Sequence, residues 1–226
     1  MKTKDTVARR ISICCGICIL ALIIQSTIDI RGITRVKSQG ESAATSTALR
    51  CEMDQREIDH LKWLTTVDQY ILVQDPNAEL NVQTDDTQCG LGKWLYGDGR
   101  KTAVAQFPEL AASFTAMEAP HRHLHQSVKD ITAAVKSSET EKAFSVYQAN
   151  TLPALAAVQA QLKVARDEMI KTAETANTKM IAGARQTTIT SISTALVATV
   201  FACLIAFYLT SRLLRKLSGI SHNLAL

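Results

Sequence analysis

The sequence predicts an all-α protein, in which a bundle of the four-helix type is joined to two membrane-spanning helices. Hydrophobic residues make up 46% of the chain and aromatic residues 5%, with nine Gly and four Pro among 226 residues. So few turn-forming residues favour long helices over a β-sandwich or barrel, which would need turns at short intervals. Two long apolar runs, and apolar stripes at helical spacing between them, support the same conclusion.

The first apolar run, residues 11–30, is long enough to span a bilayer at about 1.5 Å per residue. A cleaved signal peptide is the alternative, but no small-x-small cleavage motif follows the run, so we expect an uncleaved anchor. The second run, residues 188–210, is uncharged throughout and predicts the clearer transmembrane helix.

Basic residues lie next to both runs on the sides that face the chain ends. They are Lys2, Lys4, Arg9 and Arg10 in residues 1–10, and Arg212, Arg215 and Lys216 in residues 211–226. The segment between the runs, residues 31–187, has 18 basic and 19 acidic residues, a net charge of −1. By the positive-inside rule both termini are cytoplasmic, and residues 31–187 form an extracytoplasmic domain. This domain has no basic patch, so we expect no nucleic-acid binding.

Helical patterning in the middle segment begins near Ala48 and ends at Gln74, because a proline at position 76 disfavours helix just before it. Residues 76–88 are polar and loop-like. The Ser-, Gly-, Ala- and Thr-rich stretch 38–46 is either helix or a short loop, and the sequence does not decide between them.

Residues 89–99 contain glycines that allow one or two turns of helix at most. Helical patterning resumes over residues 108–117, and Pro120 is expected to begin another helix that runs to about Lys136. After a break at residues 137–140, a last helix is expected to start near Glu141.

The apolar stripe of this last helix comprises Leu152, Leu155, Gln159, Leu162 and Met169. Since neither Pro nor Gly lies between Pro153 and Gly183, the helix can run straight into the second apolar run.

Two histidines share the inward face of the helix that follows Pro120. The apolar stripe of that helix is Leu124, Val128, Ile131 and Val135. His121 and His125 fall on this stripe and are four residues apart, so both rings project from one face. His123 falls instead on the polar face, with Gln126, Ser127 and Asp130.

A third histidine faces inward from the first helix. His60 lies three positions before Trp63, which begins the inward stripe completed by Leu64, Val67 and Ile71. Three buried imidazoles in one domain would be costly without partners and could not all be protonated, and a metal ion would satisfy all three.

Cys89, in its glycine-rich turn, supplies a fourth ligand. His₃Cys is a reasonable tetrahedral zinc set, although ligand type alone leaves copper and iron open. Asp59 or Glu118 could accept a hydrogen bond from a ligand ring, and simple solvated charge is the alternative for both. Four protein ligands leave no open position for substrate, so we do not expect an enzyme.

The remaining cysteines offer one competing interpretation. Cys51 could form a disulfide with Cys89, but it lies nine residues before His60, about 13 Å along a helix, and a disulfide needs Cα atoms within about 7 Å. A Cys51–Cys89 disulfide and a zinc site that contains His60 and Cys89 are therefore nearly exclusive, and we favour the zinc site. The other four cysteines, which lie in the apolar runs as small apolar residues, are Cys14, Cys15, Cys18 and Cys203.

The same residues carry a family resemblance. His60, the element Cys89-Gly90-Leu91-Gly92-Lys93-Trp94 and the pair His121-x₃-His125 together resemble the chemoreceptor zinc-binding (CZB) domain over about residues 55–135. All four ligand positions of the family pattern are present. The resemblance implies a helical bundle, bound zinc and a sensory role in chemoreceptors or cyclic-dinucleotide enzymes.

The overall layout resembles the input half of a methyl-accepting chemotaxis receptor in a bacterial inner membrane. Residues 211–226 resemble the start of a HAMP linker, although its usual proline is missing and no methylated coiled-coil hairpin follows in these residues. By this analogy we expect a homodimer, cytoplasmic chemotaxis partners, and a signal through the second span set by zinc level or Cys89 oxidation. Alternatives are a truncated receptor, a membrane-tethered zinc-binding protein without signalling output, and a small-molecule sensor with a structural zinc.

Overall fold

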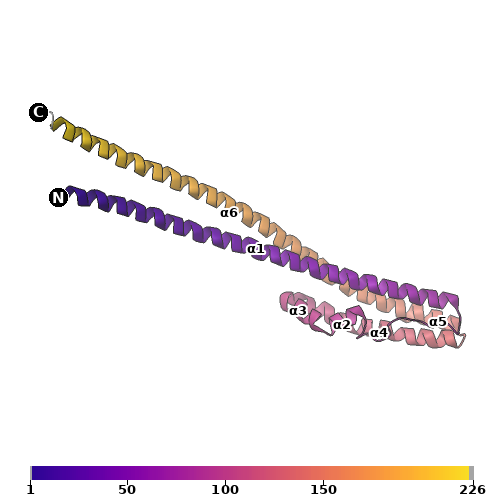
Figure 1. Cartoon of the computed structure of the whole chain (residues 1–226). Coiled ribbons are helices and arrows are strands. Elements are labelled where there is room, and N and C mark those ends of the chain that lie inside the picture. The colour runs from indigo at the N-terminus through magenta and orange to yellow at the C-terminus, as the bar shows by residue number, and fades with distance from the viewer. Residues whose placement is uncertain (1, 224–226) are drawn as a thin grey trace. The chain divides into compact units, whose positions relative to one another are not determined.

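The computed structural model describes the backbone of residues 2–223 and the side chains of residues 9, 12–212, 214 and 215. Within these limits all regular elements are helical and no strand is present, which confirms the all-α prediction. The elements are α1 (Lys2–Val73), α2 (Gly90–Leu95), α3 (Asp98–Gln106), the 3₁₀ turn η1 (Pro108–Leu110), α4 (Ala111–Lys136), α5 (Thr140–Val146), the π-helical turn η2 (Tyr147–Thr151) and α6 (Leu152–Asn223) (Figure 1).

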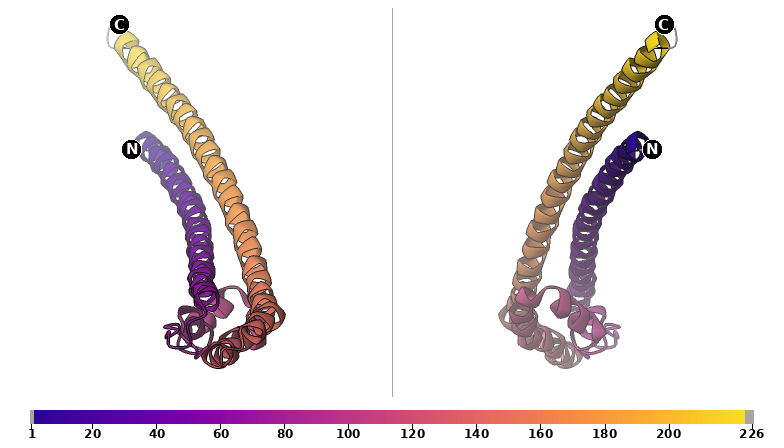
Figure 2. Two further views of the ribbon diagram at one scale, coloured as in Figure 1. Left: turned by 90° about the vertical axis from the view of Figure 1, so that its right-hand side faces the viewer. Right: turned by 90° about the vertical axis from the view of Figure 1, so that its left-hand side faces the viewer.

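The chain divides into two compact units. One unit comprises Ser42–Thr175, and the other comprises the stretches up to Glu41 and from Ala176 onward. Both α1 and α6 are uninterrupted helices (Figure 2). The stretch 38–46, which the sequence left undecided, is therefore helix, and the last helix does run into the second apolar run as expected.

The unit formed by the two ends of the chain contains both apolar runs. Each run lies in a helix that is long and apolar enough to cross a membrane, and none of the residues in the most apolar windows is buried within the protein. The two helices meet where Oγ of Ser191 donates a hydrogen bond to Asp29, and where a Cβ on Gly32 would overlap the side chain of Thr187. Residues 1 and 224–226, at the ends of the predicted cytoplasmic segments, lie outside the described residues.

The unit Ser42–Thr175 is a helical bundle with two main clusters of buried apolar side chains. The cluster beside α2 consists of Leu49, Met53, Leu91, Trp94, Leu95, Ala103, Phe107, Leu110, Phe114, Met117, Val158, Leu162, Ala165 and Met169. The cluster at the other end of α4 consists of Val67, Tyr70, Ile71, Val128, Ile131, Ala134, Val135 and Ala143. The predicted inward residues Val67 and Ile71 of α1 are thus in the core.

Helix α1 ends where the proline rule predicted. Val73 is its last residue, and Gln74 has a φ of 55°, a left-handed conformation that ends the helix before Pro76. Residues 76–88 contain turns and irregular structure, as expected.

Two helix boundaries differ from the sequence prediction. Helix α3 was not anticipated, because Gly97 and Gly99 suggested irregular structure. Helix α4 begins at Ala111 and contains Pro120 in its interior, whereas Pro120 was expected to begin a helix. Buried side chains on both sides of Pro120, including Met117 and His121, hold the helix together despite the backbone hydrogen bond that a proline cannot donate.

Two single-residue assignments were also wrong. The sequence pattern places Leu152 on the inward stripe of the last helix, but Leu152 is 38% exposed, because the buried face of α6 follows Leu155, Val158, Leu162 and Ala165 and Leu152 lies to one side of it. Ser127 was placed on the polar face of α4 but is buried, since its hydroxyl has partners inside the bundle.

Candidate metal centre

Four potential ligands meet inside the bundle although they come from three separate elements. His60 lies on α1, Cys89 is the N-cap of α2, and His121 and His125 lie on α4. One ligand atom of each residue can be chosen so that all four lie within 4.8 Å of one another. The structure thus brings together the four residues that the sequence singled out. His123, by contrast, is exposed, as its position on the polar face predicted.

The separations of the ligand atoms fit a tetrahedral zinc ion. Nε2 of His121 lies 3.2 Å from Nε2 of His60 and 3.2 Å from Sγ of Cys89, and Cys89 Sγ lies 4.0 Å from His60 Nε2. Zn–N bonds of about 2.0–2.1 Å and Zn–S bonds of about 2.3 Å in a tetrahedron put nitrogen atoms about 3.3 Å apart, and nitrogen and sulfur about 3.6 Å apart. One ion can therefore reach all three atoms with small adjustments.

The three imidazoles are buried, and burial favours their neutral, metal-binding form. His60, His121 and His125 are 3%, 0% and 1% exposed. Burial, together with the neighbouring rings of His125 and His60, lowers the pKa of His121 to about 3. Burial also lowers the pKa of His60 and of His125. Neutral rings offer a nitrogen lone pair to a metal at neutral pH.

Backbone carbonyls fix the orientation of two of the rings. Nδ1 of His60 lies 2.7 Å from the carbonyl oxygen of Arg56, and Nδ1 of His125 lies 2.8 Å from that of Gln83. In a neutral ring Nδ1 is then the donor, and the lone pair is on Nε2. Nε2 of His125 is buried without a hydrogen-bond partner in the structure, and a metal ion would satisfy it.

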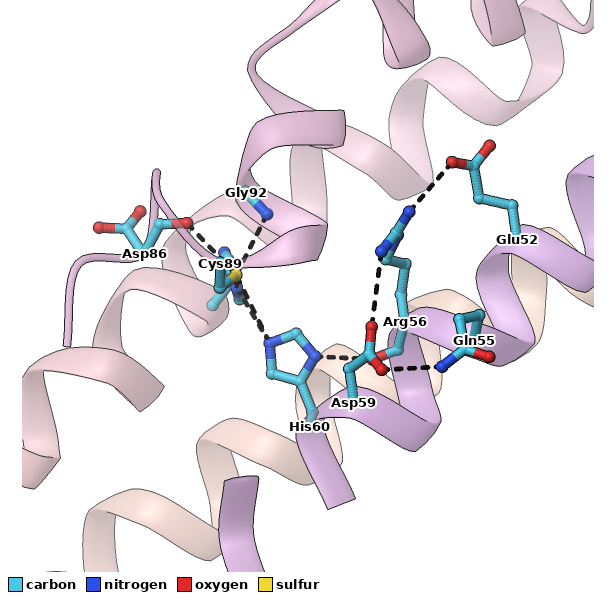
Figure 3. Close-up of polar contacts among 9 residues, drawn as sticks. Glu52, Gln55, Arg56, Asp59, His60, Asp86, Cys89 and Gly92 are labelled. Atoms are coloured by element: carbon cyan, nitrogen blue, oxygen red, sulfur yellow. Dashed lines mark hydrogen bonds and ion pairs between the residues drawn. The ribbon is translucent and has the colours of Figure 1, made fainter. Parts of the chain in front are cut away.

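Neither carboxylate considered from the sequence contacts a ligand ring. Asp59 accepts from Gln55 and pairs with Arg56 (Figure 3), and Glu118 pairs with Arg100. The sequence could have suggested the Arg56 carbonyl, because it lies one helical turn before His60. No sequence signal points to the Gln83 carbonyl, since it belongs to an irregular loop.

The Cys turn, defined as residues 86–92, holds the Cys89 sulfur toward the histidines. The backbone N–H of Gly92 donates to Cys89 Sγ at 3.2 Å, and Figure 3 shows the sulfur between Gly92 and the ring of His60. A Cβ on Gly92 would collide with the carbonyl of Asp86, so the turn requires glycine there. Burial raises the pKa of the Cys89 thiol. A zinc ion would counter this effect by stabilising the thiolate.

The comparisons with known proteins support this interpretation of the site. Residues 60–132 match the chemoreceptor zinc-binding domain family. The matched CZB segment contains all four ligand candidates and agrees with the range of about 55–135 expected from the sequence. The His-Cys-His-His cluster fits zinc, the metal of that family. No curated protein and no solved structure matches the chain significantly.

The competing disulfide is absent from the structure. Cys51 and Cys89 are both free thiols, and Cys51 is exposed on α1. Trp94 packs in the core, edge-to-face on Phe114. Tyr96 is more exposed and donates its hydroxyl hydrogen to Asp86, so it supports the Cys turn from outside.

Proposed function

We propose that the chain is a membrane-anchored zinc-binding sensor of the chemoreceptor type, with the CZB segment as its input site. The observation that carries this proposal is that one cluster of ligands joins α1, the Cys turn and α4. A bound zinc would stabilise one arrangement of these elements, so its loss would release all three at once. Because four protein ligands leave no open position for a substrate, the proposed role is sensing and not catalysis.

The proposed topology places residues 31–187 outside the cytoplasm, between spans at residues 11–30 and 188–210 of a bacterial inner membrane. The basic residues beside the two runs support it. CZB domains usually lie in the cytoplasm, so the orientation needs its own test. In intact cells a membrane-impermeant maleimide should label a variant that retains only the exposed Cys51. Labelling only after lysis would reverse the topology.

The proposed signal is zinc loss, caused by low zinc or by oxidation of Cys89. A peroxide would transfer an oxygen atom to the zinc-bound thiolate and leave as water, and the resulting sulfenate is a weaker ligand. Movement of the Cys turn would then reach α6, because Leu91 and Leu95 of α2 share a core cluster with Val158 and Leu162 of α6. Helix α6 also contains the second apolar run.

Zinc release tests this mechanism directly. The purified full-length chain is treated with hydrogen peroxide, and free zinc is followed with pyridylazoresorcinol. The wild type and Cys51→Ser should release about one zinc per chain, whereas Cys89→Ser should not respond to peroxide. Equal peroxide-triggered release from Cys89→Ser and wild type would contradict the oxidation mechanism.

We further propose that two copies associate and that residues 211–226 contact cytoplasmic chemotaxis proteins. The support is the receptor-like order of span, sensor, span and basic tail. Light scattering of the detergent-solubilised chain should give the mass of a dimer, and a monomer at micromolar concentration would count against this assembly.

A further inference from the structure

A buried pair of hydroxyl groups links the zinc-ligand helix α4 to the start of α6. Oγ of Ser127 and Oγ1 of Thr151 are 2.8 Å apart, and the two residues are 2% and 0% exposed. Ser127 donates its own hydrogen to the carbonyl of Leu124 at 2.8 Å. Thr151 must therefore be the donor between the two hydroxyls, and both groups are satisfied.

Thr151 occupies an unusual position in the backbone. It is the last residue of the π-helical turn η2, in which the N–H of Leu152 bonds to the carbonyl of Tyr147, five residues earlier. Two residues later Pro153 lacks the N–H that would continue the α-helical pattern, and a widened turn accommodates this defect. Such π turns are rare and are frequently found at functional sites.

Ser127 lies close in sequence to two ligands of the metal centre. It lies two residues after His125 and six after His121 on the same helix, which is unbroken from Ala111 to Lys136. A displacement of the His pair therefore also moves the Ser127 hydroxyl. A buried donor without an acceptor is costly. When Ser127 moves, Thr151 must therefore move with it or lose the acceptor of its hydroxyl hydrogen.

We propose that the Ser127–Thr151 hydrogen bond is the joint through which the metal state of α4 is passed to the π turn and the first turns of α6. This proposal rests on the proposed function, because it assumes that zinc binds the four-residue cluster. It adds a polar connection to α6, distinct from the apolar packing of Leu91 and Leu95.

The two connections meet α6 at different places. The hydroxyl pair acts at Thr151, the residue immediately before α6, whereas the α2 contacts lie along Val158 and Leu162. Leu124 also packs on Ala154 and Leu155, but apolar contacts of this kind are not directional and tolerate sliding. Removing one hydroxyl should therefore separate the two routes experimentally.

Three substitutions isolate the hydrogen bond. Thr151→Val removes the hydroxyl but keeps the side-chain shape, and Ser127 remains bonded to the Leu124 carbonyl. Thr151→Ser keeps the hydroxyl and should restore the wild-type behaviour. Thr132→Val is the matched control, because within the part of the chain that the structure describes the Thr132 hydroxyl donates only to the Val128 carbonyl, inside α4.

Peptide-resolved hydrogen exchange of the full-length chain in detergent, with Zn²⁺ and after chelation, is the measurement. In the wild type Zn²⁺ should slow exchange in residues 147–155 and 158–169 by about tenfold or more. In Thr151→Val the effect on 147–155 should fall to about twofold or less while that on 158–169 persists, with Zn²⁺ affinity within about threefold of wild type. Thr151→Ser and Thr132→Val should match the wild type.

The outcomes distinguish failure of the joint from failure of the sensor. Full zinc-dependent protection of residues 147–155 in Thr151→Val would overturn the joint, as would a wild type that binds Zn²⁺ without protecting these residues. A Thr151→Val effect not restored by Thr151→Ser would assign the change to packing and would also overturn it. A wild type that binds no Zn²⁺ in a direct titration would overturn both the joint and the proposed function.

Discussion

The backbone N–H of Gly92 donates a hydrogen bond to Sγ of Cys89, and the space that a side chain would need at Gly92 is filled by the carbonyl of Asp86. The position of the Cys89 sulfur therefore depends on Gly92, a residue that has no side chain to ligate a metal.

Replacing Gly92 with Ala should weaken zinc binding by at least about tenfold, because the added Cβ forces the Asp86 backbone and the Cys turn apart. Zinc affinity measured by competition with a chromophoric chelator checks this. The control is Gly90→Ala, where the Cβ would come too close only to the flexible end of Arg56 and would make ordinary contact with Asp59, so the effect should be small. Similar losses in both variants would contradict the role given to Gly92.

The chain should contain about one zinc per copy after purification, and His121→Ala should lose most of it. His121 lies at the centre of the cluster, with its Nε2 3.2 Å from both Cys89 Sγ and His60 Nε2. His123→Ala, an exposed neighbour on the same helix, should keep its zinc. Elemental analysis of the three proteins is the measurement. A metal-free wild type, or equal zinc in His121→Ala, is incompatible with the site.

The zinc-free protein should become less stable as the pH falls below about 6.5. The pKa of His121 in the folded state is lowered to about 3, and those of His60 and His125 are also lowered, so the unfolded chain binds protons more readily in this range. The stability is fully present above pH 6.5 and is lost as the pH falls toward the folded-state values.

Urea unfolding of the chelator-treated chain between pH 8 and pH 5, followed by the fluorescence of the two tryptophans, tests this pH dependence. His121→Gln should flatten the profile because it removes the group whose pKa is lowered to about 3. An unfolding free energy that rises from pH 7 to pH 5, or identical slopes in both proteins, would be the contrary result.

Trp63→Phe should lower zinc affinity by about threefold to tenfold. The Trp63 Nε1–H donates to the Gln83 carbonyl, which also accepts from Nδ1 of His125, so its loss loosens the loop that orients this ring. The control is Tyr70→Phe on the same helix, because the buried Tyr70 hydroxyl has no hydrogen-bond partner among the described residues and its removal should leave affinity unchanged. An unchanged affinity in Trp63→Phe would show that the loop does not depend on this bond.

The parts of the structure that follow from side-chain periodicity could be predicted from the sequence. His121 and His125 lie on one helix face because they are four residues apart on an apolar stripe, and the structure buries both. Gly90 and Gly92 likewise indicated a tight turn that could bring Cys89 toward the helices, and the turn is present.

The parts that depend on partners distant in sequence could not be predicted. Pro120 is compatible with the interior of α4 because of packing on both sides, which local rules for proline do not include. The polar side chain of Ser127 predicts a surface position. Ser127 is buried because its hydroxyl forms a hydrogen bond with Thr151, which is 24 residues away in the sequence. Gln83 contacts His125 through its backbone carbonyl, which every residue has. The glutamine side chain therefore gives no information about this role.

The ligands are far apart along the chain, since His60 precedes Cys89 by 29 residues and His121 by 61. A zinc ion that joins them closes two long loops, which costs conformational entropy. Folding of the bundle has to bear this cost before the metal can bind tightly. During synthesis the ribosome must complete α4 before all four ligands exist, by which time the first apolar run has already left the ribosome. We therefore expect the metal to be acquired only after α4 has been synthesised, from the zinc pool of whichever compartment this part of the chain then occupies.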